Sequence, residues 1–418
     1  MRLTPALFAH AEAAMKALLT FEYPADGALS FYFRQHRELG HADRGFVAEA
    51  CYTTLRRLRS LSARCPDDHP RKLLLAAMYC LRGWNLKQLA PILRDGDAEW
   101  LAVAKAAKTD EWPSAVRCDF PDWLFERLAP RFPGEIEALA AALNRPAPLD
   151  LRVNPMKTTR EAVLRQLASD HIAAEACRYS PLGIRLEEKP ALSKHPLFVD
   201  GSIEVQDEGS QLLGYLVAPK RGEMVADFCA GAGGKTLLLG ALMRSTGRLY
   251  AFDVAEKRLA NLKPRLARSG LSNVHPVRIE SENDQKVKRL AGKLDRVLVD
   301  APCSGLGTLR RNPDLKWRQS PQSLADLTRK QGEILASAAR LLKPGGRLVY
   351  ATCSLLAEEN EKIVDAFLAV HPDFVRCSCA EILAKQGIPL DTGEDLRLLP
   401  HRHATDGFYA AVLERRSR

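Results

Sequence analysis

The stretch Asp227-Phe-Cys-Ala-Gly-Ala-Gly-Gly-Lys-Thr236 decides the fold of this 418-residue chain. The segment Val225–Phe228 predicts a β-strand, and a helix is expected after Lys235. Glycines between a strand and a helix let the backbone approach a ligand closely, and the start of the helix offers unpaired N–H groups. The order of strand, glycine turn and helix therefore predicts an α/β domain that binds a small-molecule cofactor at this turn.

A phosphate loop is an alternative interpretation of the same turn. That motif needs a glycine five residues before Gly234, and this chain has Cys229 there. A nucleotide triphosphatase and a turn without any ligand therefore stay open as alternatives.

From residue 201 to residue 418, strands and helices alternate, which predicts a parallel sheet with helices on both of its faces. One helix is expected after the strand Arg248–Asp253 and ends near Leu266. A long helix is expected from roughly Pro321 to Leu342. The further strands are expected at Arg248–Asp253, Val274–Ile279, Leu294–Asp300, Gly346–Thr352 and Phe408–Glu414.

Two smaller domains are expected before this sheet. Residues 1–145 show apolar residues at helical spacing and predict an all-helical domain, with helices at Phe46–Arg59, Leu73–Leu81 and Asp122–Leu128. Residues 146–200 predict a small α+β module. Its strands are expected at Leu149–Asn154, Ile184–Leu186 and Leu197–Val199, and its helix from Thr159 to about Leu167.

The net charge of +10 and the pI near 9.1 favour a polyanionic partner such as nucleic acid. The ten cysteines show no zinc-ligand spacing, which predicts reduced thiols, no metal and a cytoplasmic location. No stretch is apolar enough to predict a membrane span, and no secretory signal is expected. A basic run with one aromatic residue predicts phosphate contacts and base stacking: Arg310, Arg311, Lys316, Trp317 and Arg318.

Two cysteines follow predicted strands about fifty residues apart. Cys303 lies in Asp300-Ala-Pro-Cys-Ser-Gly305, and Cys353 lies in Thr352-Cys-Ser354. Parallel sheets carry their chemistry at the carboxyl ends of strands, so both thiols are expected to face a substrate rather than to be simply buried. Asp253 also ends a strand, where a carboxylate can accept hydrogen bonds from the ribose hydroxyls of an adenosine-containing cofactor.

Together these motifs resemble the Sun/Nop class of RNA cytosine-5 methyltransferases, which use S-adenosylmethionine. The resemblance rests on Val205–Leu212, Cys229–Lys235, Asp300–Gly305, Thr352–Ser354 and Asp406–Tyr409. It implies a class I methyltransferase Rossmann-like sheet, preceded by an RNA-recognition-like module and an antiterminator-like helical domain. The helices around Asp43–Tyr52 are most similar to the bacterial 16S ribosomal RNA member.

The resemblance also implies roles for single residues. Cys353 is expected to attack carbon 6 of cytosine, Cys303 to assist release, and Asp300 and Lys235 to hold the base. The implied cofactor-binding residues are Cys229, Ala230, Gly231, Ala232, Gly233, Gly234, Lys235, Asp253 and Asp300.

Two points depart from the family pattern or stay open. Ala232 replaces the family's usual proline, and the acid that contacts adenine after the third strand is Glu280, Glu282 or Asp284. Rival functions are methylation of tRNA or another RNA, of a small molecule or of a protein, and ribosome assembly without turnover.

Overall fold

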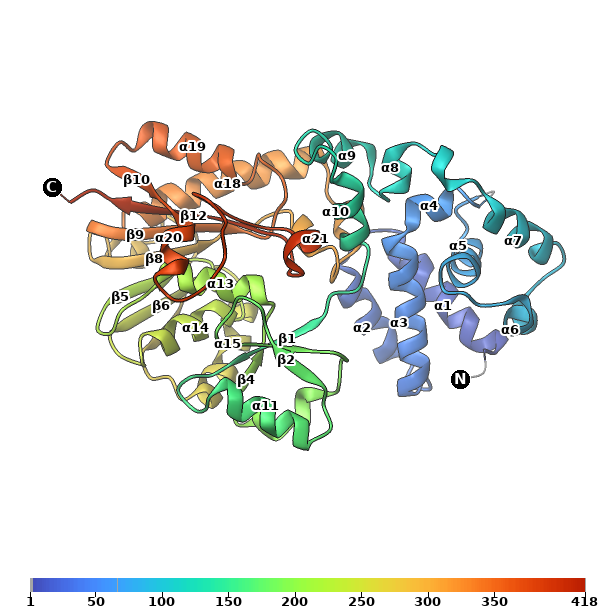
Figure 1. The fold of residues 1–418 in the computed structure, drawn as a ribbon, viewed down its shortest axis with the longest axis horizontal. Helices are drawn as coiled ribbons and strands as arrows, with labels where there is room; N and C mark the ends of the chain where they lie inside the picture. The colour runs from blue at the N-terminus through green and yellow to red at the C-terminus, as the bar shows by residue number, and fades with distance from the viewer. Residues whose placement is uncertain (1–2, 66, 418) are drawn as a thin grey trace. The chain divides into compact units, whose positions relative to one another are not determined.

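The computed structural model describes residues 3–65 and 67–417. They form two compact units, each drawn in Figure 1. The helical unit comprises residues 1–146 together with 308–321, and the sheet unit comprises residues 147–307 and 322–418. Among the described residues, no helix combines the length and the apolar character that crossing a membrane requires.

The large sheet of the sheet unit confirms the predicted α/β class. Its strand order is β10-β12-β9-β8-β5-β6-β7, and β11 also pairs with β12. The five strands from β9 to β7 along this order are parallel, whereas β12 is antiparallel to β9. The strands are β5 (Met224–Asp227), β6 (Arg248–Asp253), β7 (Val274–Arg278), β8 (Leu294–Asp300), β9 (Leu342–Thr352), β10 (Phe374–Cys377), β11 (Leu396–Leu398) and β12 (Phe408–Arg415).

Both faces of this sheet are buried, because neighbouring residues of a strand point to opposite faces. In β8, Leu298 packs into one apolar cluster, and Val297 and Val299 pack into the other. Helices α13 (Glu208–Val217), α14 (Gly234–Leu242), α15 (Glu256–Ser269) and α20 (Cys379–Ala384) contribute to the first cluster. Helices α16 (Gln285–Lys288), α18 (Pro321–Ala339) and α19 (Glu361–Val370) contribute to the second.

A small antiparallel sheet precedes the large one, with strand order β2-β3-β1-β4. Its strands are β1 (Leu149–Val153), β2 (Ala174–Ala176), β3 (Gly183–Leu186) and β4 (Ile203–Val205). Helix α11 (Arg160–Ser169), which the sequence predicts from Thr159 to about Leu167, packs on this sheet, and the side chain of Thr159 caps it.

The predicted strand at Leu197–Val199 is wrong, because these residues belong to the short helix α12 (Pro196–Val199). Pro196 occupies the first turn, where its fixed φ and missing N–H suit a helix. The ring of His195 accepts a hydrogen bond from the N–H of Leu197 at 3.3 Å. These local contacts outweigh the strand preference of the apolar residues.

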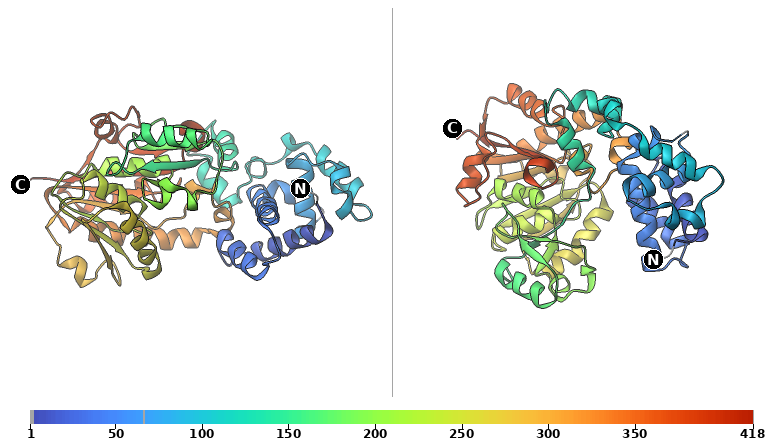
Figure 2. Two further views of the ribbon diagram at one scale, coloured as in Figure 1. Left: turned by 90° about the horizontal axis from the view of Figure 1, so that it is seen from below. Right: turned by 45° about the vertical axis from the view of Figure 1, so that its right-hand side comes forward.

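The N-terminal part of the helical unit, up to residue 146, is coloured blue to teal in the two views of Figure 2 and is built from helices around one main apolar cluster. The predicted helix Phe46–Arg59 is divided between α3 and α4, and Leu73–Leu81 continues from α5 into a π-helical turn, Ala77–Leu81. The α-helices are α1 (Pro5–Leu18), α2 (Ala25–Gln35), α3 (His41–Arg56), α4 (Leu58–Ser62), α5 (Pro70–Ala76), α6 (Leu86–Leu89), α7 (Asp97–Ala106), α8 (Ser114–Arg117), α9 (Asp122–Leu128) and α10 (Ile136–Leu143).

Residues 308–321, which include α17 (Leu315–Arg318), belong to the helical unit although they lie between strands of the sheet unit. The ammonium of Lys316 is fully buried and donates hydrogen bonds to the carbonyl of Arg56 at 2.7 Å and to Oδ1 of Asn144 at 2.8 Å. The expected phosphate contact by Lys316 is therefore wrong, because its side-chain nitrogen is buried and makes its hydrogen bonds inside the protein. The division into a helical domain (1–145), a small α+β module (146–200) and a catalytic domain (201–418) stays a prediction.

Candidate active site

A cavity of about 780 Å³ opens at the carboxyl ends of β5, β6, β8 and β9. All of its lining residues belong to the sheet unit. The fold brings together at this cavity most of the residues that the sequence singled out: Cys229, Ala230, Gly231, Ala232, Gly234, Lys235, Asp253, Asp300, Cys303 and Cys353. Gly233 lies in the same turn but does not line the cavity.

The glycine turn uses its glycines in two ways. Gly231 has φ +56° and open space where a Cβ would lie, so its backbone faces the cavity. Gly233 has φ +83°, and a Cβ there would collide with Leu262 of α15. One glycine therefore leaves room for a ligand, whereas the other lets the turn pack closely against a helix.

Two carboxylates at strand ends brace this turn. Asp253 accepts hydrogen bonds from the N–H of Gly231 at 2.8 Å and from the N–H of Ala255 at 2.7 Å. Asp227 accepts one from the hydroxyl of Thr236 at 2.7 Å, and burial raises its pKa to about 7. Within the described structure, the other carboxylate oxygen of Asp227, Oδ1, is buried and finds no partner. An unpaired buried acceptor beside a cavity suits a ligand that brings an N–H or O–H donor.

The two cysteines predicted from the sequence face each other. Their sulfur atoms lie 3.3 Å apart, which is a hydrogen-bond distance and well beyond the roughly 2.05 Å of a disulfide. The hydrogen bond with Cys353, followed by burial, holds the pKa of the Cys303 thiol well above its ordinary value. The Cys303 thiol therefore keeps its proton near neutral pH, and the contact between the two sulfurs joins the two cysteine loops at the cavity.

Lys235 and Asp300 form a second pair in the cavity. The Lys235 ammonium donates to Oδ2 of Asp300 at 2.6 Å. Burial by itself would lower the pKa of Lys235, but the charge of Asp300 and the hydrogen bond outweigh it and raise this pKa. The pair therefore presents a carboxylate and a charged donor side by side, which suits the edge of a polar base.

Sequence reasoning missed Glu359, which joins the loops that carry the two cysteines. Its side chain is fully buried. One carboxylate oxygen accepts from the N–H of Ser304 at 2.8 Å and from the amide of Gln331 at 3.0 Å. The other accepts from the hydroxyls of Ser304 and Ser354, the residues that follow the two cysteines. No signal in the sequence points to this role, because the acidic run Glu358-Glu359-Asn360-Glu361 is typical of an exposed helix start.

The structure narrows the choice of acid after the third strand. Glu280 and Glu282 line the cavity, whereas Asp284 does not. Asp284 instead caps α16, where it accepts a hydrogen bond from the N–H of Lys286 at 2.8 Å. The ammonium of Lys330 donates a hydrogen bond to Glu282 at 2.6 Å. Lys330 belongs to α18 and also lines the cavity, and the sequence did not suggest it.

Two protein-family models match the chain between residues 120 and 414. A model described as 16S rRNA methyltransferase RsmB/F matches residues 214–414, and a model of a ferredoxin-like domain of RsmF/B-like methyltransferases matches residues 120–193.

Individual relatives extend the match over most of the chain. The probable ribosomal RNA small subunit methyltransferase B of Synechocystis sp. is 40% identical, with 91% of this chain and 93% of the relative aligned. The ribosomal RNA small subunit methyltransferase B of Pseudomonas syringae pv. tomato is 32% identical over 89% of each chain. A solved methyltransferase homolog protein from Pyrococcus horikoshii is 29% identical, with a TM-score of 0.63 over 73% of this chain and 99% of its own. The resemblance found in the sequence is thereby confirmed, and the chain belongs to the 16S rRNA methyltransferase RsmB/F family.

Proposed function

We propose that this enzyme methylates carbon 5 of a cytosine in small-subunit ribosomal RNA. The observation that carries the proposal is the pair of facing sulfurs, 3.3 Å apart, in a cavity that also holds the Lys235–Asp300 pair. Carbon 5 of cytosine is a weak nucleophile, and a sulfur added to carbon 6 makes it a strong one. The choice of small-subunit ribosomal RNA as the substrate is based on the names of the curated relatives.

The cofactor of the proposal is S-adenosylmethionine, which supplies an electrophilic methyl group when bound. The glycine turn offers backbone room at Gly231, and the carboxylate of Asp253 stands at the end of β6 for the ribose. The unpaired Oδ1 of Asp227 offers an acceptor for a donor group of the ligand. Glu280 or Glu282 remains for the adenine amino group.

In this proposal the two thiols act in sequence. Cys353 forms a bond to carbon 6, and Asp300 and Lys235 hold the base edge on which charge develops. Once Cys353 is bonded to the ring, Cys303 loses the hydrogen-bond partner and the charge that raised its pKa. Its pKa then falls, and Cys303 releases its own proton to solvent. After carbon 5 has received the methyl group, the Cys303 thiolate takes the proton from carbon 5. The electron pair of that C–H bond restores the double bond between carbons 5 and 6, and Cys353 leaves as a thiolate.

The test is methyl transfer to 16S ribosomal RNA by the purified enzyme and its two cysteine variants. Cys353→Ala is expected to give neither product nor covalent complex. Cys303→Ala is expected to accumulate a protein–RNA complex that survives denaturing electrophoresis. Normal turnover by Cys303→Ala without a trapped complex would contradict the assignment.

The RNA is identified separately. Bisulfite sequencing of total RNA from cells that lack the protein is expected to show one cytosine of 16S ribosomal RNA that has lost its methyl group. If the methyl group were missing from tRNA or another RNA instead, the proposed reaction would stand and the proposed substrate would be rejected.

A further inference from the structure

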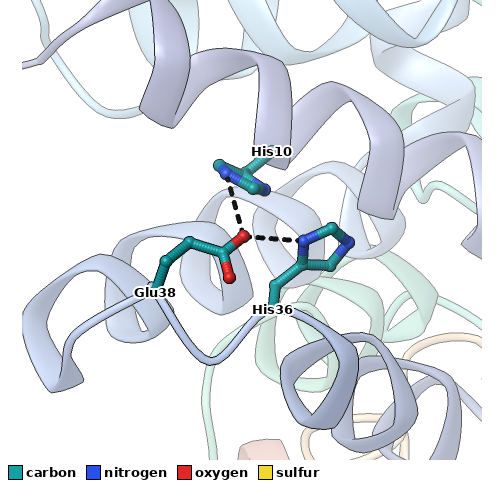
Figure 3. Close-up of side chains that lie close together, drawn as sticks. All are labelled: His10, His36 and Glu38. Carbon is teal, nitrogen blue, oxygen red and sulfur yellow. Dashed lines mark hydrogen bonds and ion pairs between the residues drawn. The ribbon is translucent and has the colours of Figure 1, made fainter.

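A cluster of potential metal ligands lies in the helical unit and shares no residue with the cavity. Figure 3 shows the imidazole of His10, from α1, facing His36 and Glu38, which lie at and just beyond the end of α2. One carboxylate oxygen of Glu38 lies 2.8 Å from Nδ1 of His36 and 3.8 Å from Nε2 of His10. We propose that these three side chains bind a divalent transition-metal ion, with Zn²⁺ as the best match.

The distances fit a common ion. Zinc binds imidazole nitrogen and carboxylate oxygen at about 2.0–2.1 Å, so neighbouring ligands of a tetrahedral site lie roughly 3.4 Å apart. The two measured distances lie on either side of this value, and all three ligand atoms are within 4.8 Å of one another. Glu38 has 59% of its side chain exposed, so it can adjust its position.

Nδ1 of His10 has a hydrogen-bond partner, so that Nε2 is the ring nitrogen available to the ion. The Tyr32 hydroxyl lies 2.9 Å from Nδ1 of His10. The phenol oxygen can accept a hydrogen bond from the Nδ1–H of His10. In the tautomer with Nδ1 protonated, this contact satisfies Nδ1–H and leaves a free lone pair on Nε2 for the ion. Partners of this kind are typical of metal-bound histidines.

The turn that carries the other two ligands is fixed by its backbone and by one apolar anchor. The N–H of His36 donates to the carbonyl of Tyr32 at 3.1 Å, and Leu39 is buried just beyond Glu38. Arg44 donates to the carbonyl of Leu39 at 2.9 Å. The ligands therefore start close to their bound positions, which lowers the conformational entropy lost on binding.

Binding requires a defined proton change at His36. In the free protein, the His36 Nδ1–H can donate to Glu38. When the ion binds at Nδ1, the ring proton is carried by Nε2, and the carboxylate exchanges its hydrogen bond for a bond to the metal. Two imidazoles and one carboxylate favour zinc, nickel or cobalt over magnesium or calcium, which prefer oxygen ligands.

The proposal goes beyond methyl transfer, because none of its three residues lines the cavity. Three protein ligands leave a fourth position open to water, as in zinc sites that are not closed by the protein. The bound ion would connect α1 to the turn after α2 and so stabilise the helical unit by mass action.

Zinc binding by the full-length, tag-free protein tests the proposal. After removal of metals with a chelator, Zn²⁺ alone is titrated in a calorimeter, and Co²⁺ is used to record visible absorption. The variants are His10→Gln, His36→Gln and Tyr32→Phe, and His41→Gln is the control because His41 is exposed, lies in the same unit and is not one of the ligands. The native chain is expected to bind one more zinc ion than His10→Gln or His36→Gln. Any zinc bound by cysteines is present in the native chain and in the variants alike, so it does not affect this difference.

Tyr32→Phe keeps the ring but removes the hydroxyl, and we expect its zinc affinity to fall about tenfold. His41→Gln is expected to bind zinc as the native chain does. The proposal is overturned if His10→Gln and His36→Gln, shown to be folded by circular dichroism, bind as many ions as the native chain with the same affinity. An effect of His41→Gln equal to that of the ligand variants would overturn it as well.

Discussion

At the scale of single residues, the buried carboxylate of Glu359 fixes the two thiols relative to each other. It contacts the residues that follow Cys303 and Cys353, and its charge contributes to the raised pKa of Cys303. A carboxylate without exposure to water is stable only when its lone pairs are satisfied, and four hydrogen bonds satisfy them here.

Glu359→Gln tests this role. The amide has nearly the same shape as the carboxylate, but an NH₂ group replaces one of the two oxygens. That NH₂ group donates, and it faces neighbours that donate hydrogen bonds to the carboxylate in the native protein. We expect the free energy of unfolding to fall by about 1–3 kcal/mol and the rate of methyl transfer to fall as well. Since the negative charge is lost, the pKa of Cys303 should fall, and its alkylation in a Cys353→Ser background should begin at lower pH. Glu381→Gln, on the exposed side of α20, is the control; equal alkylation profiles for both variants would contradict the role of Glu359.

At the scale of elements, the turn from β5 to α14 depends on two glycines with different requirements. Gly233→Ala places a methyl group against Leu262 and in a left-handed backbone conformation, so we expect a loss of stability of about 2–4 kcal/mol. Gly231→Ala adds only the backbone strain, about 1–2 kcal/mol, but directs its methyl group into open space beside the cavity. Thermal unfolding and binding of S-adenosylmethionine should therefore separate the two variants.

The expected pattern is a larger loss of stability in Gly233→Ala and a larger loss of cofactor affinity per unit of lost stability in Gly231→Ala. If both variants lost stability and affinity in the same proportion, the division of roles between the two glycines would be rejected.

At the scale of the whole molecule, residues 308–321 make the helical unit discontinuous in sequence, because they follow the first cysteine loop and then complete that unit. Burial lowers the pKa of Lys316 in this segment to about 7, from 10.5 for an exposed lysine. Between these two pH values the unfolded chain binds more protons at this site than the folded chain. The contribution of Lys316 to stability therefore rises with pH from about 7 towards 10 and is least favourable below 7.

Lys316→Met removes this titration. We expect the native chain to gain up to about 1.4 kcal/mol of stability per pH unit above pH 7 relative to the variant. The five tryptophans, Trp84, Trp100, Trp112, Trp123 and Trp317, all lie in the helical unit, so their fluorescence during urea unfolding reports on that unit. Identical dependence of stability on pH in both proteins would show that Lys316 does not titrate in this range.

Much of the sheet unit could be predicted because its signals are local. A strand, a glycine turn and a helix require particular residues within about ten positions, and the ends of β6 and β8 were predicted to the residue. Parallel strands place their carboxyl ends at one edge, so the convergence of Asp253, Asp300, Cys303 and Cys353 followed from chain order alone. The one wrong strand, Leu197–Val199, failed because a proline and a capping histidine favour a helix there.

The sequence by itself determined the alternation of strands and helices, the glycine turn and the two cysteines at strand ends, since each depends on residues that are close along the chain. Only the tertiary structure decided that the Cys303 thiol keeps its proton, how Glu359 joins two loops, that Lys316 is buried, and that His10 meets His36 and Glu38. These properties arise from groups far apart in sequence. Burial and hydrogen bonding then change their charge states, and no local pattern records which distant partner a side chain meets.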